Sequence, residues 1–259
     1  MDLGIAGRKA IVCASSRGLG KACARALAEA GCEVVINGRD QKNLEAAAAE
    51  IAKATGVKVI PVAADLSTPE GQQALLAACP TPDILINNNG GPPPRDFREL
   101  TRQQILDGVI ANMVVAIELI QKVIGPMTER KFGRIVNITS GSVKMPLAGL
   151  DLSSGARAGL TAFLAGVSRT VADKNVTINN ILPGAFDTDR LKSAIGYQAK
   201  QKNISPEEAA AARAASIPAR RFGNPDEFGA ACAFLCSSHA GYITGQNLLI
   251  DGGVFNGAF

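Results

Sequence analysis

The stretch CASSRGLG, residues Cys13–Gly20, follows the apolar run Lys9–Ala14 and opens into a helical pattern over Gly18–Ala30. Small residues and glycines between a strand and a helix let the backbone approach a phosphate, whose charge suits the helix N-terminus. Many α/β proteins carry one such turn, so the turn alone is weak evidence. A second strand follows and ends at Asn37, and that context is typical of a dinucleotide site.

Beyond this turn, short β-branched runs alternate with longer helical patterns. That alternation predicts a parallel sheet with crossover helices. We therefore expect one α/β domain over residues 1–259, a Rossmann-like, doubly wound parallel sheet of about seven strands flanked by helices. The expected strands are Lys9–Ala14, Glu33–Asn37, Val57–Val62, Asp83–Asn87, Gly133–Thr139, Val176–Leu182 and Asn247–Ile250.

Three helix starts are clearly marked in the sequence. Ser67–Glu70, Ser205–Glu207 and Asn224–Glu227 each present a capping side chain, then proline, then an acidic residue. Proline suits the first helical turn, and the acidic side chain suits the positive end of the helix dipole.

Residues 186–215 interrupt the alternation with a long, alanine-rich helical segment. In such a sheet, an insertion after the carboxyl end of a strand lies over the ligand crevice. We interpret the segment as a substrate lid, and a plain surface helical hairpin is the alternative.

Composition and charge exclude several classes of protein. With 27 basic and 23 acidic side chains the net charge is +4, and no basic run with interleaved aromatics indicates nucleic acid. The single histidine, His239, argues against a multi-histidine metal site, and we expect no metal. The six cysteines form no CxxC pair and indicate buried, reduced thiols in a cytoplasmic protein. No stretch approaches the roughly 20 apolar residues that span a bilayer, so we expect no membrane partner.

The end of the second strand predicts which dinucleotide is bound. An NAD site usually places a carboxylate there for the adenine ribose, but this chain has Asn37, Gly38 and Arg39. No carboxylate would repel a 2′-phosphate, and Arg39 with Arg17 can form a guanidinium clamp around it. The alternative is that both arginines are ordinary surface charges. We predict NADP(H) as the cofactor.

At this point the sequence resembles the short-chain dehydrogenase/reductase family, in its 3-oxoacyl-ACP reductase-like branch, over essentially the whole chain. The turn matches TGxxxGxG with Cys13 and Ala14 in place of Thr-Gly, and residues 87–90 (NNNG) match NNAG. The resemblance implies a cofactor-binding set, and commonly a tetramer packed through helices and the C-terminal strand. The expected cofactor-binding residues are Ser15, Ser16, Arg17, Leu19, Arg39, Asp65, Leu66, Asn88, Asn89, Gly90, Arg157, Pro183, Gly184 and Thr188.

The active site departs from the family pattern of asparagine, serine and YxxxK. Asn112 and Ser140 match the asparagine and the serine, but the family's spacing places Ser153 at the tyrosine and Arg157 at the lysine. The resemblance implies that the missing phenol is the general acid. Loss of a positioned acid typically lowers a rate by about 10²- to 10⁴-fold.

Two other residues are candidates for the missing acid. Lys144 follows Ser140 in a segment that leaves the fifth strand beside the pocket, and partial desolvation would let it donate a proton. An ordinary solvated lysine is the alternative. Tyr197 could swing from the lid, whereas Tyr242 is expected to be structural. The stiff segment 90–95 (GGPPPR) would form a rim of the crevice, where Arg95 meets an anionic substrate or only solvent.

Two functions remain open from the sequence. The leading one is an NADP(H)-dependent oxidoreductase that interconverts a carbonyl and an alcohol of a small molecule. In it, Ser140 holds the carbonyl, Ser153 holds a hydrogen bond or a water, Arg157 positions the ribose and Asn112 supports a water chain. The alternative is an NADP(H)-binding sensor or partner subunit that has lost the chemistry. A homo-oligomer, a tetramer or a dimer, is expected in either case.

Overall fold

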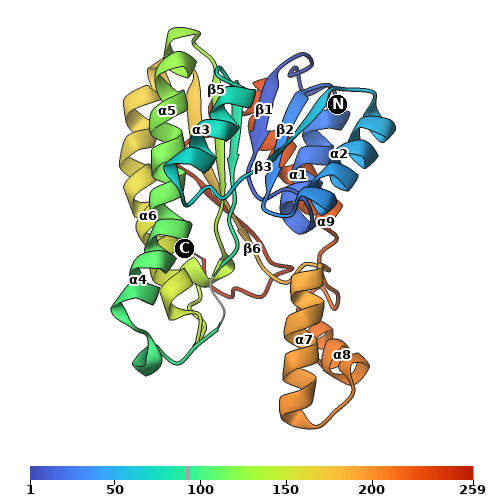
Figure 1. Ribbon diagram of the computed structural model, residues 1–259. Coiled ribbons are helices and arrows are strands. Elements are labelled where there is room, and N and C mark those ends of the chain that lie inside the picture. Colours follow the sequence, from blue (N-terminus) through green and yellow to red (C-terminus); the bar gives the residue numbers. More distant parts are fainter. Residues whose placement is uncertain (92–93, 259) are drawn as a thin grey trace.

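The computed structural model describes residues 1–91 and 94–258, and seven strands of this part form one parallel sheet in the order β3-β2-β1-β4-β5-β6-β7 (Figure 1). Every pairing between neighbouring strands is parallel. The strands are β1 Lys9–Val12, β2 Glu33–Gly38, β3 Val59–Ala63, β4 Ile84–Asn87, β5 Gly133–Ile138, β6 Val176–Pro183 and β7 Asn247–Ile250.

Helices cover both faces of the sheet, as a doubly wound fold requires (Figure 1). The α-helices are α1 Gly18–Glu29, α2 Gln41–Thr55, α3 Pro69–Ala78, α4 Arg102–Val109, α5 Val115–Glu129, α6 Asp151–Val171, α7 Asp189–Lys202, α8 Pro206–Ala215 and α9 Pro225–Cys236. Helices α1, α2 and α9 share one hydrophobic cluster with the sheet, and α3, α5 and α6 share the other. The predicted architecture is confirmed.

The central strand β1 shows why the sheet is buried on both faces. Ala10 and Val12 point into the cluster under α1 and α9, whereas Ile11 points into the cluster under α5 and α6. Successive side chains of a strand face opposite sides, so a strand between two helical layers reads as an unbroken apolar run. The strand ends at Val12 rather than Ala14, because Ala14 adopts a φ of 44° and turns the chain.

The three helix starts expected from the sequence are present. Thr68, Ser205 and Asn224 cap α3, α8 and α9, and a proline occupies the first turn of each. The last two form capping boxes with Glu208 and Glu227. All six cysteines are free and buried, as the composition indicated.

Helices α7 and α8 form a hairpin that stands apart from both helical layers (Figure 1). The hairpin has a small apolar cluster of its own, which includes Leu191, Ile195 and Ala209. A bridge between Phe186 and Gly223 closes its base beside the end of β6. The expected helical segment is therefore a projecting hairpin, and its role as a lid stays a prediction.

The expectation that no stretch is apolar enough to cross a membrane is wrong for Arg102–Glu129. This continuous helical segment has an 18-residue window of mean hydropathy 1.6, which is long and apolar enough by composition. One face of α5 packs against the sheet, where Leu119 and Met127 are fully buried. A helix that covers a parallel sheet is apolar for that reason.

A ladder of asparagine side chains crosses the carboxyl half of the sheet in register. Asn87 on β4 donates to Asn137 on β5 (2.9 Å), which donates to Asn180 on β6 (3.1 Å), which donates to Asn247 on β7 (2.8 Å). The first three are buried. Because a buried amide without a partner is costly, the ladder fixes the relative positions of four strand ends.

Substitution of Asn137 by alanine should destabilise the protein by about 2–3 kcal/mol, because it leaves buried groups of Asn87 and Asn180 without partners. We expect Tm to fall by roughly 4–10 °C in a thermal unfolding experiment. Asn247→Ala is the control at the exposed end of the ladder, where water replaces the lost bond, and should change the free energy of unfolding by less than about 1 kcal/mol. Equal losses in the two variants would contradict a cooperative ladder.

Candidate functional site

The candidate site lies at the carboxyl edge of the sheet, where the chain order reverses between β1 and β4. In doubly wound sheets, ligands bind at this topological switch point. A side-chain hydrogen bond joins the segments that follow the two strands: the Asn88 side chain donates to the Ala14 carbonyl oxygen (3.1 Å). Asn88, expected to bind cofactor, thus also holds the glycine-rich turn in place.

The N-terminus of α1 differs from those of its neighbours. Arg17 precedes the helix and makes no side-chain cap, so the first N–H groups of α1 have no side-chain acceptor. Side chains do cap six other α-helices, α2, α3, α4, α7, α8 and α9; the capping residues are Asp40, Thr68, Thr101, Thr188, Ser205 and Asn224. An anion is the natural acceptor for such N–H groups.

Gly20 leaves the space that the turn needs. A Cβ atom there would collide with the Ala14 carbonyl oxygen and lie 2.9 Å from the Asn88 side-chain nitrogen. Cys13 stands where the family has threonine, and burial raises the pKa of its thiol to about 12. The thiol is thus a small protonated group of the cluster under α5 and α6, and Leu19 packs partly buried against the other cluster, under α1 and α9.

The hydroxyl and the amide of Ser15 are bonded to the protein itself, and the contact predicted between Ser15 and the cofactor stays a prediction. Its N–H donates to the Asn37 carbonyl (2.7 Å), and its Oγ donates to the Val12 carbonyl (2.6 Å) and accepts from the Asn37 N–H (3.0 Å). The Asn37 side chain is engaged as well, with Ala14, Val62 and Ala64. Both residues hold the turn against β2 and β3, which the sequence did not reveal.

Three residues expected to bind cofactor lie free around the ends of β1 and β2. Ser16 faces Gly38, at which a Cβ atom would lie 3.1 Å from the serine Oγ. Arg17 and Arg39 are exposed. Among the described residues, neither guanidinium forms an ion pair. This arrangement suits a phosphate group near Gly38.

The end of β3 carries two further predicted residues. Asp65 is exposed, and one of its carboxylate oxygens accepts from the Ser67 N–H (2.9 Å). Leu66 is buried in the core, so only its backbone can face a ligand. The cofactor contact predicted for Asp65 stays a prediction.

Asn89 and Gly90 continue from the end of β4. The Asn89 side chain donates to the Ala111 carbonyl (2.9 Å) and accepts from the Gly90 N–H (2.8 Å). Asn89 therefore joins β4 to the π-helical turn Ile110–Val114. Of the predicted rim, Pro92 and Pro93 lie outside the described residues, and Arg95 is exposed with its N–H bonded to the Gly149 carbonyl (3.0 Å).

The loop after β6 approaches the site from the other side. Thr188 lies against the glycine-rich turn, because its methyl carbon is 3.7 Å from the position of a Cβ atom on Gly18. Gly184 packs on Asp251 without room for a side chain. Pro183 presents its carbonyl oxygen 3.3 Å from the position of a Cβ atom on Gly141. The structure thus brings Pro183, Gly184 and Thr188 to the edge that holds the turn and Ser140.

Ser140 has a free hydroxyl proton because of a neighbour that the sequence did not single out. Its Oγ accepts from both the N–H (3.1 Å) and the hydroxyl (2.9 Å) of Ser142, which is buried. A serine oxygen has two acceptor positions and one proton. With both positions filled, the Ser140 proton is left to donate to a ligand.

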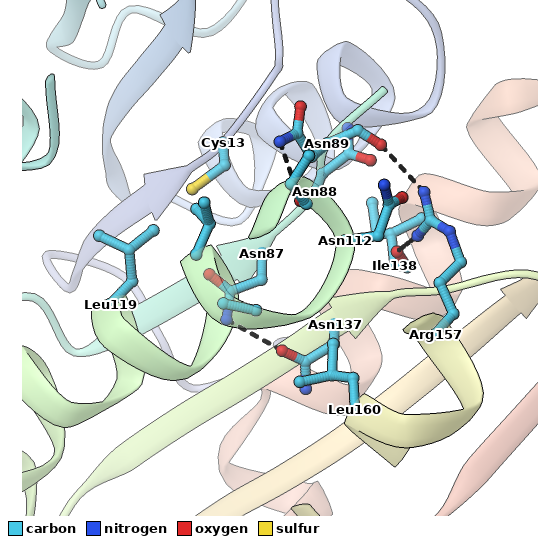
Figure 2. Close-up of a pocket in the computed structure, with 13 residues that line it drawn as sticks. Cys13, Asn87, Asn88, Asn89, Asn112, Leu119, Asn137, Ile138, Arg157 and Leu160 are labelled. Atoms are coloured by element: carbon cyan, nitrogen blue, oxygen red, sulfur yellow. Dashed lines mark hydrogen bonds between the residues drawn. The ribbon is translucent and has the colours of Figure 1, made fainter. Parts of the chain in front are cut away.

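Arg157 is buried and holds three parts of the site together. Its Nε donates to Ser153 Oγ (3.2 Å), and its two terminal nitrogens donate to the carbonyls of Ile138 (2.7 Å) and Asn89 (3.0 Å). The last two bonds are drawn in Figure 2. Burial, and then the like charge of Arg190, lower the pKa of Arg157 to about 10. The side chain stays cationic at neutral pH.

This geometry limits the role expected for Arg157. A guanidinium has five N–H donors, and three of them are bonded to the protein. Two remain for the predicted ribose contact. Because Ser153 Oγ accepts from Arg157, the Ser153 proton is free to donate.

A cavity of ≈ 20 Å³ lies between these groups, and Asn87, Asn112 and Arg157 are among its lining residues (Figure 2). That volume holds about one water molecule. Asn112 donates to the Gly108 carbonyl (3.1 Å), and its carbonyl oxygen, like that of Asn87, is buried without a partner among the described residues. A water is the simplest partner for both oxygens.

The other candidates for a proton donor lie in open surroundings. Lys144 is exposed, so the desolvation that its predicted role requires is missing; its ammonium is 5.3 Å from the centre of the Phe255 ring. Tyr197 is 67% exposed on α7 and bonds to Gln201 (3.0 Å). Tyr242, expected to be structural, is fully exposed instead.

Comparisons with known proteins agree with this geometry. Residues 13–255 match the family model described as enoyl-(acyl carrier protein) reductase. The NADPH-dependent reductase BacG of Bacillus subtilis is 34% identical over 95% of this chain and 97% of its own length. A 3-oxoacyl-[acyl-carrier-protein] reductase of Aquifex aeolicus is 31% identical over 98% and 100%.

The chain is also similar to solved structures of reductases. L-sorbose reductase from Gluconobacter frateurii, in complex with NADPH and L-sorbose, superposes with a TM-score of 0.94 at 28% identity. The match covers 99% of this chain and 100% of that one. The NADPH-dependent reductase YwfH, involved in bacilysin biosynthesis, has a TM-score of 0.90 at 32% identity and covers 97% and 100%.

Substitution of Gly20 by alanine should open the glycine-rich turn, because the new methyl group collides with the Ala14 carbonyl. We expect a lower Tm and at least a 10-fold weaker affinity for NADPH, measured by fluorescence titration, as overpacking costs about 1–3 kcal/mol. Gly166→Ala is the matched control on exposed α6, where a Cβ atom meets nothing within 4 Å. Unchanged NADPH affinity in Gly20→Ala would remove the turn from the binding site.

Proposed function

The chain belongs to the short-chain dehydrogenase/reductase family, and on that premise we propose that it is an NADP(H)-dependent oxidoreductase that interconverts a carbonyl and an alcohol. One observation carries the proposal: an uncapped helix N-terminus lies beside two arginines that have no ion pair among the described residues. The relatives named as NADPH-dependent reductases support the same cofactor.

The described residues fit a bound NADP(H). The N-terminus of α1 would accept the pyrophosphate, and Ser16, Arg17 and Arg39 would surround the 2′-phosphate. Asp65 would meet the adenine, and Pro183 with Thr188 would line the nicotinamide side. When bound, NADPH supplies the hydrogen and the electron pair that reduce the carbonyl carbon.

Ser140 is the residue best placed to bind the substrate carbonyl. Because Ser142 fills both acceptor positions of the Ser140 oxygen, the Ser140 proton is left to donate a hydrogen bond to the carbonyl. A hydrogen bond that strengthens as negative charge develops on the carbonyl oxygen lowers the barrier. Ser142 acts through Ser140 and is a positioning residue.

Proton delivery requires a group other than a phenol in this chain. We propose that the free Ser153 proton bonds to the developing alkoxide and that a water in the cavity beside Asn112 resupplies it. Arg157 holds the Ser153 oxygen, and its cationic charge stabilises the negative charge nearby. This route keeps the roles predicted for Asn112, Ser153 and Arg157, and it leaves the exposed Lys144 outside the proton path.

The second candidate function is an NADP(H)-binding sensor or partner subunit without turnover. One observation favours it: Ser153 is buried and bonded to Arg157 where the family has tyrosine and lysine. Either protein would form a homo-oligomer, which the exposed apolar side chains Phe163 on α6 and Leu248 on β7 support. Six free thiols support a reducing, cytoplasmic compartment.

The double substitution Arg17→Ala/Arg39→Ala should weaken NADPH binding by about 10- to 100-fold for each lost charged contact, and leave NADH binding unchanged. Isothermal titration with both cofactors measures the effect. Arg25→Ala is the control, because Arg25 lies on α1, away from its N-terminus, and already pairs with Glu29 (2.8 Å). If the wild-type protein binds both cofactors equally well, the arginines form no clamp.

Substitution of Ser140 by alanine should lower kcat by about 10²- to 10³-fold and leave NADPH affinity unchanged, because in this proposal the Ser140 proton bonds to the substrate carbonyl and not to the cofactor. Loss of NADPH absorbance with a panel of ketones, 3-oxoacyl thioesters, quinones and imines measures turnover. Ser216→Ala, at an exposed position after α8, is the control. Tight NADPH binding without turnover of any panel member, or of alcohols with NADP⁺, would favour the sensor instead.

A further inference from the structure

A second guanidinium reaches the place where the family's tyrosine would stand. Arg190, in the first turn of α7, lies close to Gly91 and Ser153. A Cβ atom on Gly91 would be 2.9 Å from an Arg190 terminal nitrogen and 3.3 Å from Ser153 Oγ. The three residues come from the loop after β4, from α6 and from α7. Nothing in the sequence patterns pointed to Arg190.

Two positive charges, those of Arg157 and Arg190, lie near Ser153, and no described carboxylate pairs with either of them. Arg157 and Arg190 are close enough for the charge of one to lower the pKa of the other. Neither forms an ion pair with a described residue. Two like charges held near each other, one of them buried, favour an anion between or beside them.

Serine in place of tyrosine makes room for that anion. Where the family has a tyrosine ring, Ser153 has a short side chain beside Gly91 and Arg190. In this proposal a substrate anion takes part of the volume of that ring, and the Ser153 proton is kept for the carbonyl oxygen. Glycine at position 91 lets Arg190 lie close to Ser153, because a Cβ atom there would be 2.9 Å from an Arg190 terminal nitrogen.

We propose that Arg190, beside Ser153 and the Gly91 backbone, forms a subsite for a carboxylate of the substrate, so that the carbonyl compound reduced by this chain is an oxo acid. The planar guanidinium fork of Arg190 matches a carboxylate, and the Ser153 proton is kept for the carbonyl oxygen. This proposal rests on the proposed function for the reaction itself. The carboxylate binds unchanged, while the carbonyl carbon takes the hydrogen and electron pair from NADPH and the alcohol oxygen takes one proton.

The subsite is separate from the positions that the cofactor phosphates would occupy. Those positions are the N-terminus of α1 and the ends of β1 and β2, around Arg17 and Arg39. Arg190 instead meets Ser153, on the side of the substrate carbonyl. A carboxylate there would also reduce the repulsion between Arg190 and Arg157, so binding should stabilise the protein.

The kinetic test compares 2-oxo and 3-oxo acids with their methyl esters as substrates with NADPH. The wild-type enzyme should prefer an acid to its ester by at least 10-fold in kcat/KM. Arg190→Gln should lower kcat/KM for the acid by about 10- to 100-fold, leave the ester unchanged and leave the Kd of NADPH unchanged. Lys192→Gln is the matched control on α7, because that exposed lysine pairs with Asp187 (3.3 Å).

Two kinetic outcomes would overturn the proposal. Esters reduced as well as acids would show that no carboxylate is recognised. A weaker NADPH affinity in Arg190→Gln, with equal losses for acid and ester, would assign Arg190 to the cofactor.

A binding test does not depend on turnover. Oxamate and malonamate, unreactive carboxylate mimics of the two kinds of oxo acid, are titrated into the complex of the protein with NADP⁺, beside the neutral oxamide and malonamide. One carboxylate should bind and raise Tm, and Arg190→Gln should abolish both effects. If this holds while no oxo acid is reduced, the proposed reaction fails and the anion subsite stands. If neither carboxylate binds more tightly than its neutral counterpart, the subsite is wrong.

Discussion

The hydrogen bond from Asn88 to the Ala14 carbonyl is the contact on which the site depends. It joins the ends of β1 and β4 at the point where the chain order of the sheet reverses. Gly20 starts α1 against the same carbonyl, and only a residue without a side chain fits there. Because these three segments meet at one oxygen atom, the N-terminus of α1 is held open toward a ligand instead of being closed by a capping side chain.

Asparagine side chains hold several backbone segments in position at the carboxyl edge of the sheet. Asn37 holds the glycine-rich turn against β2 and β3, and Asn89 joins β4 to the π-helical turn that carries Asn112. An amide both donates and accepts, so it can satisfy the free backbone groups at a strand end and also link to a neighbour. The result is a rigid polar edge on which a few free groups, such as the Ser140 proton, are left for a ligand.

The replacement of tyrosine and lysine by Ser153 and Arg157 keeps the positive charge of the candidate site but removes the phenol. Arg157 is buried, bonded to two backbone carbonyls and to Ser153, and Arg190 adds a second positive charge nearby. Two such charges favour ligands with a negative group. Our proposal therefore attributes the departure from the family pattern to a different substrate rather than to a loss of function.

Sequence by itself determined the doubly wound sheet, the strand positions, the marked helix starts and the glycine-rich turn, because alternation of apolar runs and capping chemistry are local properties. The resemblance to the family pointed to Asn112, Ser140, Ser153 and Arg157 as site residues, and their roles stay predictions. Only the tertiary structure decided which polar groups are free. The hydroxyl and the amide of Ser15 are bonded to neighbouring residues. Ser142 donates to Ser140 and leaves the Ser140 proton free, and Arg190 on α7 lies close to Gly91 and Ser153. The contacts of Ser15 with Asn37 and of Arg190 with its surroundings join residues distant in sequence. The bond between Ser142 and Ser140 spans only two residues, but it depends on a side-chain conformation that no apolar or capping pattern encodes.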